Sequence, residues 1–165
     1  MEKIAHVCPL GGSSTSDPYN EVGTIIEIGG KRYRFVKNAE SSATLPYKGV
    51  CYHDPDDAAL TNVYLPYTVG TEGHNLIAGI VMAEDGLPAG SYGWVLVSGV
   101  CTATAYASGQ AIAKGDILLG RQVAGVAHLY KDTAGAVQAT PIVALEDLTT
   151  GVTVATDIKV FVNIV

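Results

Sequence analysis

The sequence predicts a mostly β fold: a single small β-barrel or β-sandwich with a flexible N-terminal arm and long loops. Three observations support this prediction. Segments rich in β-branched and aromatic residues recur along the 165 residues. Turn signals separate them at intervals of roughly 8 to 12 residues, which is typical of sandwiches and barrels. Only residues 136–147 have the propensity to compete as a helix, and Pro141 opposes it.

Residues 1–22 are expected to form the flexible arm, because the stretch GGSSTSDP at 11–18 is polar and rich in turn-forming residues. Such an arm is either disordered or draped over a neighbouring subunit. Residues 23–165 then form the β-barrel or sandwich domain. Within it, residues 40–75 are expected to be a loop-rich insertion.

The first strong element is a hairpin with strands at 24–28 and 31–36 around Gly29-Gly30. Two glycines suit a two-residue primed turn, because both of its central positions can need positive φ. The resulting register places opposite charges on one face and apolar side chains on the other. The expected pairs are Ile28–Lys31, Glu27–Arg32, Ile26–Tyr33 and Ile25–Arg34.

Further strands follow in the pattern of β-forming residues. Their expected ranges are 49–52, 62–65, 76–82, 92–104, 117–120, 123–130, 137–145 and 158–165. The strongest is 92–104, which carries the single tryptophan, Trp94. Apolar residues fall on both faces near Trp94, so this part is expected to be covered on both sides. Trp94 shares its face with Leu96 and Val100, which predicts that its ring packs in the core.

Composition limits the classes of partner. The formal net charge of -6 opposes non-specific binding to nucleic acid or to anionic membranes. The densest basic group, Lys31-Arg32-Tyr33-Arg34, is best interpreted as a solvated strand face. Only 16% of residues are charged and 48% are hydrophobic, so we expect partners to cover part of the surface in an assembly.

Tyrosines gather in the loop-rich middle of the chain, at Tyr47, Tyr52, Tyr64 and Tyr67. A tyrosine-rich β surface can bind sugars or proteins, because the ring is apolar and the hydroxyl polar. Ordinary half-buried packing of loops is the favoured alternative.

Cysteine usage points to a reducing compartment. Cys8, Cys51 and Cys101 form no CxxC pair, so we expect three reduced, mostly buried thiols. The start, MEKIAHVCPLGG, lacks the apolar core of a signal peptide, and no run is long enough for a membrane helix. Synthesis and folding in the cytoplasm are therefore expected.

No motif predicts catalysis. The sequence lacks HExxH, GxSxG, a Walker A loop and a strand-linked GxGxxG. The best metal candidate is the group His53, Asp54, Asp56 and Asp57, whose oxygens suit calcium. It lacks the D-x-D-x-D-G spacing, so a solvated acidic loop is the favoured interpretation.

Two adjacent carboxylate pairs, Glu84-Asp85 and Glu146-Asp147, lie near predicted strand ends. Neighbouring residues of a strand point to opposite faces, which makes each pair a poor shared acid–base site. We therefore expect no enzyme activity, no catalytic residue, no cofactor and no metal.

A series of motifs carries a family resemblance. In chain order they are KRYRFVKNA (31–39), PAGSYGWVLVSGV (88–100), CTATAYASGQAIAKGDIL (101–118), TPIVALE (140–146) and IKVFVNIV (158–165). Taken together, they resemble phage head decoration, or auxiliary capsid, proteins. Residues 40–75 lie outside the resemblance, and the segment before Leu145-Glu146 departs from the family's usual Gly-Val-Ala.

The resemblance implies a non-enzymatic virion protein that binds the outer surface of an assembled capsid and stabilises it. Its expected partners are the major capsid protein and further copies of itself, with a trimer favoured. Its expected location is the capsid exterior. Three alternatives remain: a carbohydrate-binding β module of a phage fibre or head, a collar or tail component, and a small enzyme or metal protein that uses His53.

Overall fold

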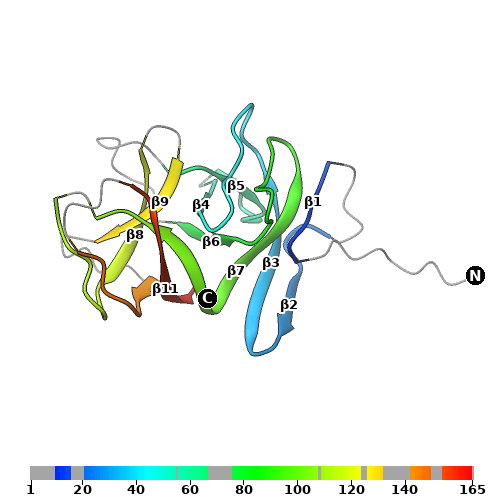
Figure 1. Cartoon of the computed structure of the whole chain (residues 1–165). Helices are drawn as coiled ribbons and strands as arrows, with labels where there is room; N and C mark the ends of the chain where they lie inside the picture. Colours follow the sequence, from blue (N-terminus) through cyan, green and yellow to red (C-terminus); the bar gives the residue numbers. More distant parts are fainter. Residues whose placement is uncertain are drawn as a thin grey trace, which may run out of the picture.

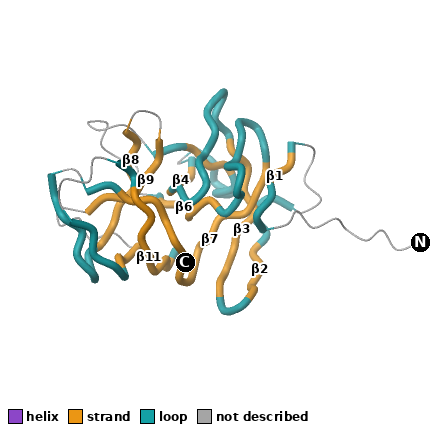
Figure 2. The backbone as a smooth tube through the Cα atoms, viewed as in Figure 1, coloured by secondary structure: helices purple, strands orange, loops and turns teal. Residues whose placement is uncertain are grey.

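A computed structural model describes residues 10–15, 21–54, 56–66, 76–107, 109–123, 126–131, 142–149 and 154–164. All regular secondary structure in these residues is β, which confirms the mostly β prediction (Figure 2). The strands are β1 (Ser13–Ser14), β2 (Ile25–Ile28), β3 (Lys31–Asn38), β4 (Val50–His53), β5 (Asn62–Tyr64), β6 (Ile77–Val81), β7 (Tyr92–Ala105), β8 (Ile117–Val123), β9 (Val126–Lys131), β10 (Ile142–Ala144) and β11 (Thr156–Asn163). No helix in the described ranges is long and apolar enough to cross a membrane.

Strand β7, with 14 residues, connects two groups of strands (Figure 1). Its first half pairs with β3 and β6, and strand pairing continues from β6 through β4 and β5 back to β3. Its second half pairs with β11, and pairing continues through β10, β8 and β9 back to the end of β7. We call β3–β6 the N-terminal group and β8–β11 the C-terminal group. Both groups therefore depend on β7.

The register of the first hairpin is confirmed. The pairs between β2 and β3 are Ile25–Arg34, Ile26–Tyr33, Glu27–Arg32 and Ile28–Lys31, as the sequence predicted. Gly29 and Gly30 have φ of 59° and 74°, the positive values that a primed turn with two such residues requires. The two-residue turn at Gly29-Gly30 therefore predicted this register correctly.

The tryptophan is a core residue, as predicted. Trp94 is 1% exposed, and its ring lies 5.0 Å from that of Phe35, its partner on β3. Every residue from Trp94 to Val97 is buried, so the first half of β7 is covered on both faces.

The expectation that Val100 shares the buried environment of Trp94 is wrong. From Val100 onward burial alternates, and Val100 is 43% exposed although it was expected to share the environment of Trp94. Gly99, with φ of 121°, lies between the two halves, and the pairing with β3 shifts register opposite Arg32 and Tyr33. The side that Val100 shares with Trp94 is covered only along the first half of β7.

Another expectation is wrong at the hairpin between β8 and β9. The sequence predicted one strand over 123–130, whereas β8 extends to Val123 and β9 begins at Val126, its partner. The intervening Ala124-Gly125 is a weaker turn signal than Gly29-Gly30. Of the strand expected at 137–145, the structure describes residues 142–145, and Ile142–Ala144 form β10.

Part of the expected arm lies against the domain. Ser13 and Ser14 pair with Gly93 and Tyr92 of β7, and Leu10 packs against the core. Residues 1–9 and 16–20 of that arm lie outside the described residues. The expected loop-rich insertion supplies β4 and β5, two of the strands in the N-terminal group.

We predict that Trp94→Ala lowers the free energy of unfolding by about 3–5 kcal/mol, because it opens a large cavity against Phe35. Chemical denaturation measures this loss. Val154→Ala is the control: Val154 is 71% exposed, so the change should be within about 0.5 kcal/mol. A loss below about 1 kcal/mol for Trp94→Ala would contradict the core assignment.

Candidate functional site

The tyrosines expected in a contact surface lie in different environments. Tyr47 is 37% exposed, and Nζ of Lys48 lies 5.1 Å from the centre of its ring. Tyr64 is half-buried, and its hydroxyl donates to Asp54 at 3.4 Å. Tyr52 is buried, and Tyr67 lies outside the described residues. These side chains therefore do not form one exposed aromatic surface.

Tyr52 instead joins the two groups of strands. It lies on β4, and its hydroxyl accepts a hydrogen bond from the Gly120 N–H at 2.9 Å and donates to the Gly120 carbonyl at 3.1 Å. Gly120 belongs to β8. A Cβ atom at Gly120 would lie 2.5 Å from the Tyr52 ring and 2.8 Å from Val50. The absence of a side chain at Gly120 is what lets β4 approach β8 so closely.

The acidic loop after β4 is held by hydrogen bonds to its own backbone. Asp57 accepts hydrogen bonds from the N–H groups of Ala59, Thr61 and Asn62, and these bonds lower the pKa of its carboxyl to about 2. Asp54 accepts from the Asp56 N–H in the same way. These contacts are typical of Asx turns.

No group of three or more His, Cys, Asp or Glu side chains is arranged to hold a metal ion within the described ranges. The members of the metal candidate have separate partners: His53 contacts Arg34, and Asp57 accepts hydrogen bonds from backbone N–H groups.

His53 is buried, and Arg34 donates from Nη1 to its Nε2 at 3.2 Å. Burial and then the positive charge of Arg34 lower the pKa of His53 to about 4, because both oppose protonation of the imidazole. His53 is therefore neutral near pH 7. Arg34 is drawn inward from the basic group 31–34, which leaves that group without a continuous exposed patch.

The described cysteines are poor nucleophiles. Cys51 and Cys101 are free and buried, and burial raises the pKa of each thiol to about 12. Cys8 lies outside the described residues. Neither described thiol supports covalent chemistry at neutral pH.

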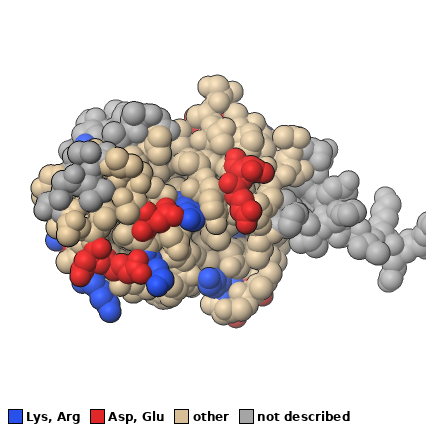
Figure 3. Space-filling view, in the orientation of Figure 1, with Lys and Arg blue, Asp and Glu red and all other residues tan. Residues whose placement is uncertain are grey.

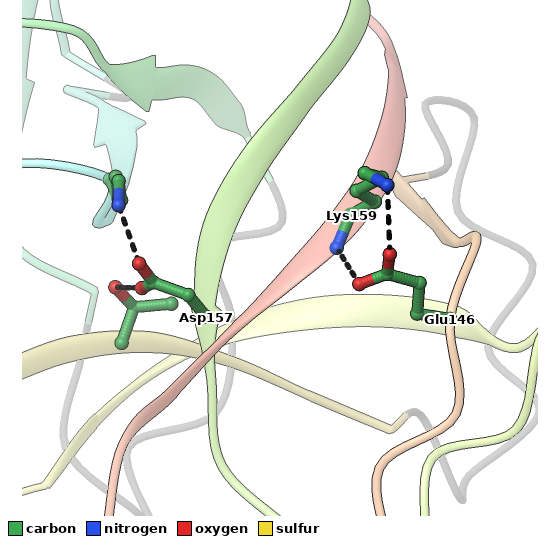
Figure 4. A network of polar contacts seen from close by, with 5 residues as sticks. Glu146, Asp157 and Lys159 are labelled. Carbon is green, nitrogen blue, oxygen red and sulfur yellow. Dashed lines mark hydrogen bonds and ion pairs between the residues drawn. The ribbon is translucent and has the colours of Figure 1, made fainter.

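Two ion pairs hold the outer side of β11 to its surroundings (Figure 4). Lys159 pairs with Glu146 at 3.2 Å, and Glu146 also accepts from the backbone N–H of Lys159 at 2.9 Å. Asp157, also on β11, pairs with Lys48 and accepts a hydrogen bond from the Thr104 hydroxyl at 3.3 Å. These carboxylates support the fold rather than converge on a reaction centre.

The other carboxylates of the two adjacent pairs with described contacts are Asp147 and Glu84. Asp147 accepts from the backbone N–H of Lys114 at 2.7 Å, whereas Glu146 faces Lys159. The Glu84 side chain lies next to Gly11. Glu146 and Asp147 therefore have different partners, and the expectation for Glu84-Asp85 stays a prediction.

Exposed apolar side chains form the strongest candidate for a functional surface. Three of them, together with the half-buried Val143, occupy one line of direct strand partners, which we call the apolar row. It runs from Val100 on β7 through Phe161 on β11 and Val143 on β10 to Ile117 on β8. Val143 is half-buried, and the other three are 39–43% exposed.

Sequence reasoning missed the apolar row, because its members are far apart in the chain and only the strand register aligns them. A local signal did exist. Val100 is flanked by Ser98 and Thr102, and Phe161 by Lys159 and Asn163. An apolar residue alternating with polar ones on the outward side of a strand marks such a surface.

No protein-family model matches the chain, and no curated protein matches it.

We predict that Gly120→Ala lowers the free energy of unfolding by about 1–3 kcal/mol, because the new methyl group meets Tyr52 and Val50 at the junction of the two strand groups. Thermal and chemical denaturation provide the measurement. Gly11→Ala is the matched control, since a Cβ there would lie 3.5 Å from Glu84, an ordinary contact distance. Equal effects of the two substitutions would contradict the close approach of β4 and β8.

Acidification is expected to destabilise the protein through His53. Its pKa is about 4 in the folded chain and near 6.5 when unfolded. The unfolded chain therefore binds more protons between these values, and stability falls as the pH drops from 6.5 to about 4. The loss is on the order of 3 kcal/mol.

Chemical denaturation at a series of pH values measures this loss. His53→Gln, which retains an acceptor for Arg34, should make the profile flatter. His128 is also buried with a lowered pKa, so His128→Gln serves as the control that leaves the His53 contribution in place. An unchanged slope in His53→Gln would show that His53 does not cause the decline.

Proposed function

We propose that the chain is a non-enzymatic structural protein of a phage virion that binds the outer surface of the assembled capsid and stabilises it. The observation that carries this proposal is a surface with few charges on which large apolar side chains remain exposed. On the face shown in Figure 3, charged side chains form small separate groups within a mostly uncharged surface. Such a surface is suited to covering by other proteins.

The hairpin of β2 and β3 provides the most prominent part of that surface. It projects beyond the neighbouring strands (Figure 1), and Ile25 and Ile28 on it are 41% and 51% exposed. In the strand order, β2 is a terminal strand that pairs with β3 alone among the described strands. Its other edge can therefore contact a protein shell through both side chains and backbone groups.

Symmetry explains how modest contacts of this kind could stabilise a capsid. Burial of apolar surface contributes roughly 25 cal/mol per Å². A shell presents the same site many times, so the contribution of one contact is repeated around the particle. The role requires no catalytic residue, which is consistent with the separate structural contacts of the carboxylates and the buried thiols described above.

We further infer that each circuit of strand pairs closes as a small barrel, with β7 as the shared strand. The inward residues of β11 support this inference: Ile158, Val160 and Val162 are at most 3% exposed and alternate with exposed residues. Closure removes open strand edges, which would otherwise promote aggregation.

The alternatives receive less support from the contacts. A carbohydrate site would need several exposed aromatic rings together, whereas Tyr47 is 37% exposed, Tyr64 is half-buried, and Tyr52 is buried with its hydroxyl bonded to Gly120. A reaction centre would need convergent polar groups, whereas His53 and Asp57 face different partners. A collar or tail protein could present the same surface, and the binding experiment separates it from a head protein.

We predict that the purified chain co-sediments with empty, expanded heads of the phage that encodes it, and that it raises their melting temperature. Ile25→Thr combined with Ile28→Thr should weaken binding roughly 10- to 100-fold, because the contact loses apolar burial. Val154→Thr is the matched control for an exposed apolar side chain outside the hairpin.

A chain that stays in the supernatant at all concentrations would overturn the capsid proposal. Binding to purified tails instead of heads would replace it with the collar or tail alternative. Equal binding by the hairpin variant and the parent chain would show that another surface faces the shell.

A further inference from the structure

We propose that Arg121 and His128 form a binding site for the oxyanion group of a small ligand, a carboxylate or a phosphate. The inference goes beyond capsid binding and does not depend on it. The two residues lie on β8 and β9, at the other end of the molecule from the hairpin of β2 and β3 (Figure 1). The proposal rests on buried nitrogen atoms without partners, a positive charge without a carboxylate, and the aromatic rings beside them.

The two side chains share one face of the hairpin of β8 and β9. Arg121 and His128 are direct partners in the ladder between these strands. Their Cβ atoms therefore lie about 4.5–5.5 Å apart on the same side. Leu118 and Leu129, which are fully buried in the core, lie on the opposite face, because successive residues of a strand alternate. The pair therefore lies on the face that turns away from this part of the core.

His128 is deeply buried and yet has no hydrogen-bond partner in the described part of the chain. It is 3% exposed, and neither Nδ1 nor Nε2 is bonded to any described residue. Buried polar groups are nearly always hydrogen-bonded, because an unmade bond is unfavourable. Burial and then the positive charge of Arg121 lower the pKa of His128, so the ring is neutral near pH 7. A neutral imidazole has one N–H donor to offer to an oxyanion.

Arg121 carries the positive charge that an oxyanion requires. Its Nε is also buried without a hydrogen-bond partner among the described residues. The ion pairs between described residues all use lysine side chains, so no described carboxylate neutralises Arg121. A guanidinium donates from Nε and Nη in one plane, and this geometry matches two oxygens of a carboxylate or a phosphate. Arg121 therefore supplies the principal donors of the site.

Two tyrosine rings lie against these side chains. Cζ of Arg121 lies over the ring of Tyr130, 5.6 Å from its centre. The ring of Tyr106 lies 5.1 Å from that of His128, at an angle of 36°. These contacts restrict Arg121 and His128 before a ligand arrives, which reduces the entropy lost on binding. Apolar rings also lower the local dielectric constant, which strengthens charge-assisted hydrogen bonds.

Another Arg–His pair shows why this one is available to a ligand. In the N-terminal group, Arg34 donates from Nη1 to Nε2 of His53 at 3.2 Å. That pair also has two buried atoms without partners, Nε of Arg34 and Nδ1 of His53, but its members are bonded to each other. Arg121 and His128 make no such bond, since both ring nitrogens of His128 lack a described partner. Both side chains can therefore bind the same oxyanion.

An NMR titration of the full chain tests the proposal. Sodium acetate and sodium phosphate are the probes for the two kinds of oxyanion, each added near pH 7 at an ionic strength held constant with sodium chloride. We expect saturable shifts of the His128 ring resonances, with a dissociation constant on the order of 1 mM. His53, which is bonded to Arg34, is the internal control and should not shift. The probe that binds more tightly identifies the oxyanion class of the ligand.

Variants of Arg121 separate specific binding from a general effect of charge. Arg121→Gln removes the guanidinium and should raise the dissociation constant at least 10-fold. Arg121→Lys keeps the charge without the planar donors and should bind with intermediate affinity. Arg32→Gln is the matched control, because it removes the same charge from a half-buried position on β3 and should bind as the parent does. The dispersion of each NMR spectrum shows whether the variant is folded.

Three outcomes would overturn the proposal. They are no saturable His128 shift up to about 50 mM of either probe, well above the expected range, shifts of equal size at His53 and His128, or unchanged affinity in folded Arg121→Gln. The titration of the parent chain needs no variant, so it decides the matter even if Arg121→Gln does not fold. If the chain fails to bind heads but His128 shifts as expected, the capsid proposal fails and this inference stands.

Discussion

The hydrogen-bonded ladders along β7 are the constraint on which the rest of the structure depends. One continuous strand pairs with β3 and β6 along its first half and with β11 along its second half. The first half is covered on both faces and therefore carries apolar residues from Trp94 to Val97, whereas the second is covered on one face and alternates. Gly99 marks the change between the two patterns. The C-terminal group exposes the apolar row because no segment among the described residues covers the outer face of this second half.

Most acidic side chains that suggested chemistry in the sequence serve the backbone instead. Asp54, Asp57, Glu146 and Asp147 each accept at least one main-chain N–H bond. Loops that connect short strands leave many such donors without partners, and a carboxylate satisfies them well. An acidic cluster in a loop-rich β protein is therefore weak evidence for a metal or a reaction centre, and the exposed apolar side chains are the more informative feature of this surface.

The parts that could be predicted from sequence depend on local chemistry. Gly29-Gly30 determined a turn and hence four pairs of residues, and the run of β-forming residues around Trp94 determined a buried strand. The parts that could not be predicted depend on contacts between distant segments. No residue close to Tyr52 in the sequence predicts that its hydroxyl reaches Gly120. No residue close to Val100 in the sequence predicts that it pairs with Phe161. Parity along one strand failed at Val100 because the side that it shares with Trp94 is covered only along the first half of β7, and the weak turn signal at Ala124-Gly125 concealed the boundary between β8 and β9.

The central position of β7 also has a consequence during translation. All strands of the N-terminal group have been synthesised once Ala105 is made, but β11 begins only at Thr156. At about 5–20 residues per second, the roughly 50 intervening residues take on the order of 3–10 s. For that interval the nascent chain has one complete group and a second half of β7 with no antiparallel partner. Chaperones that act on newly made chains would meet the apolar side of Cys101, Ala103 and Ala105 in this window, before β11 covers it.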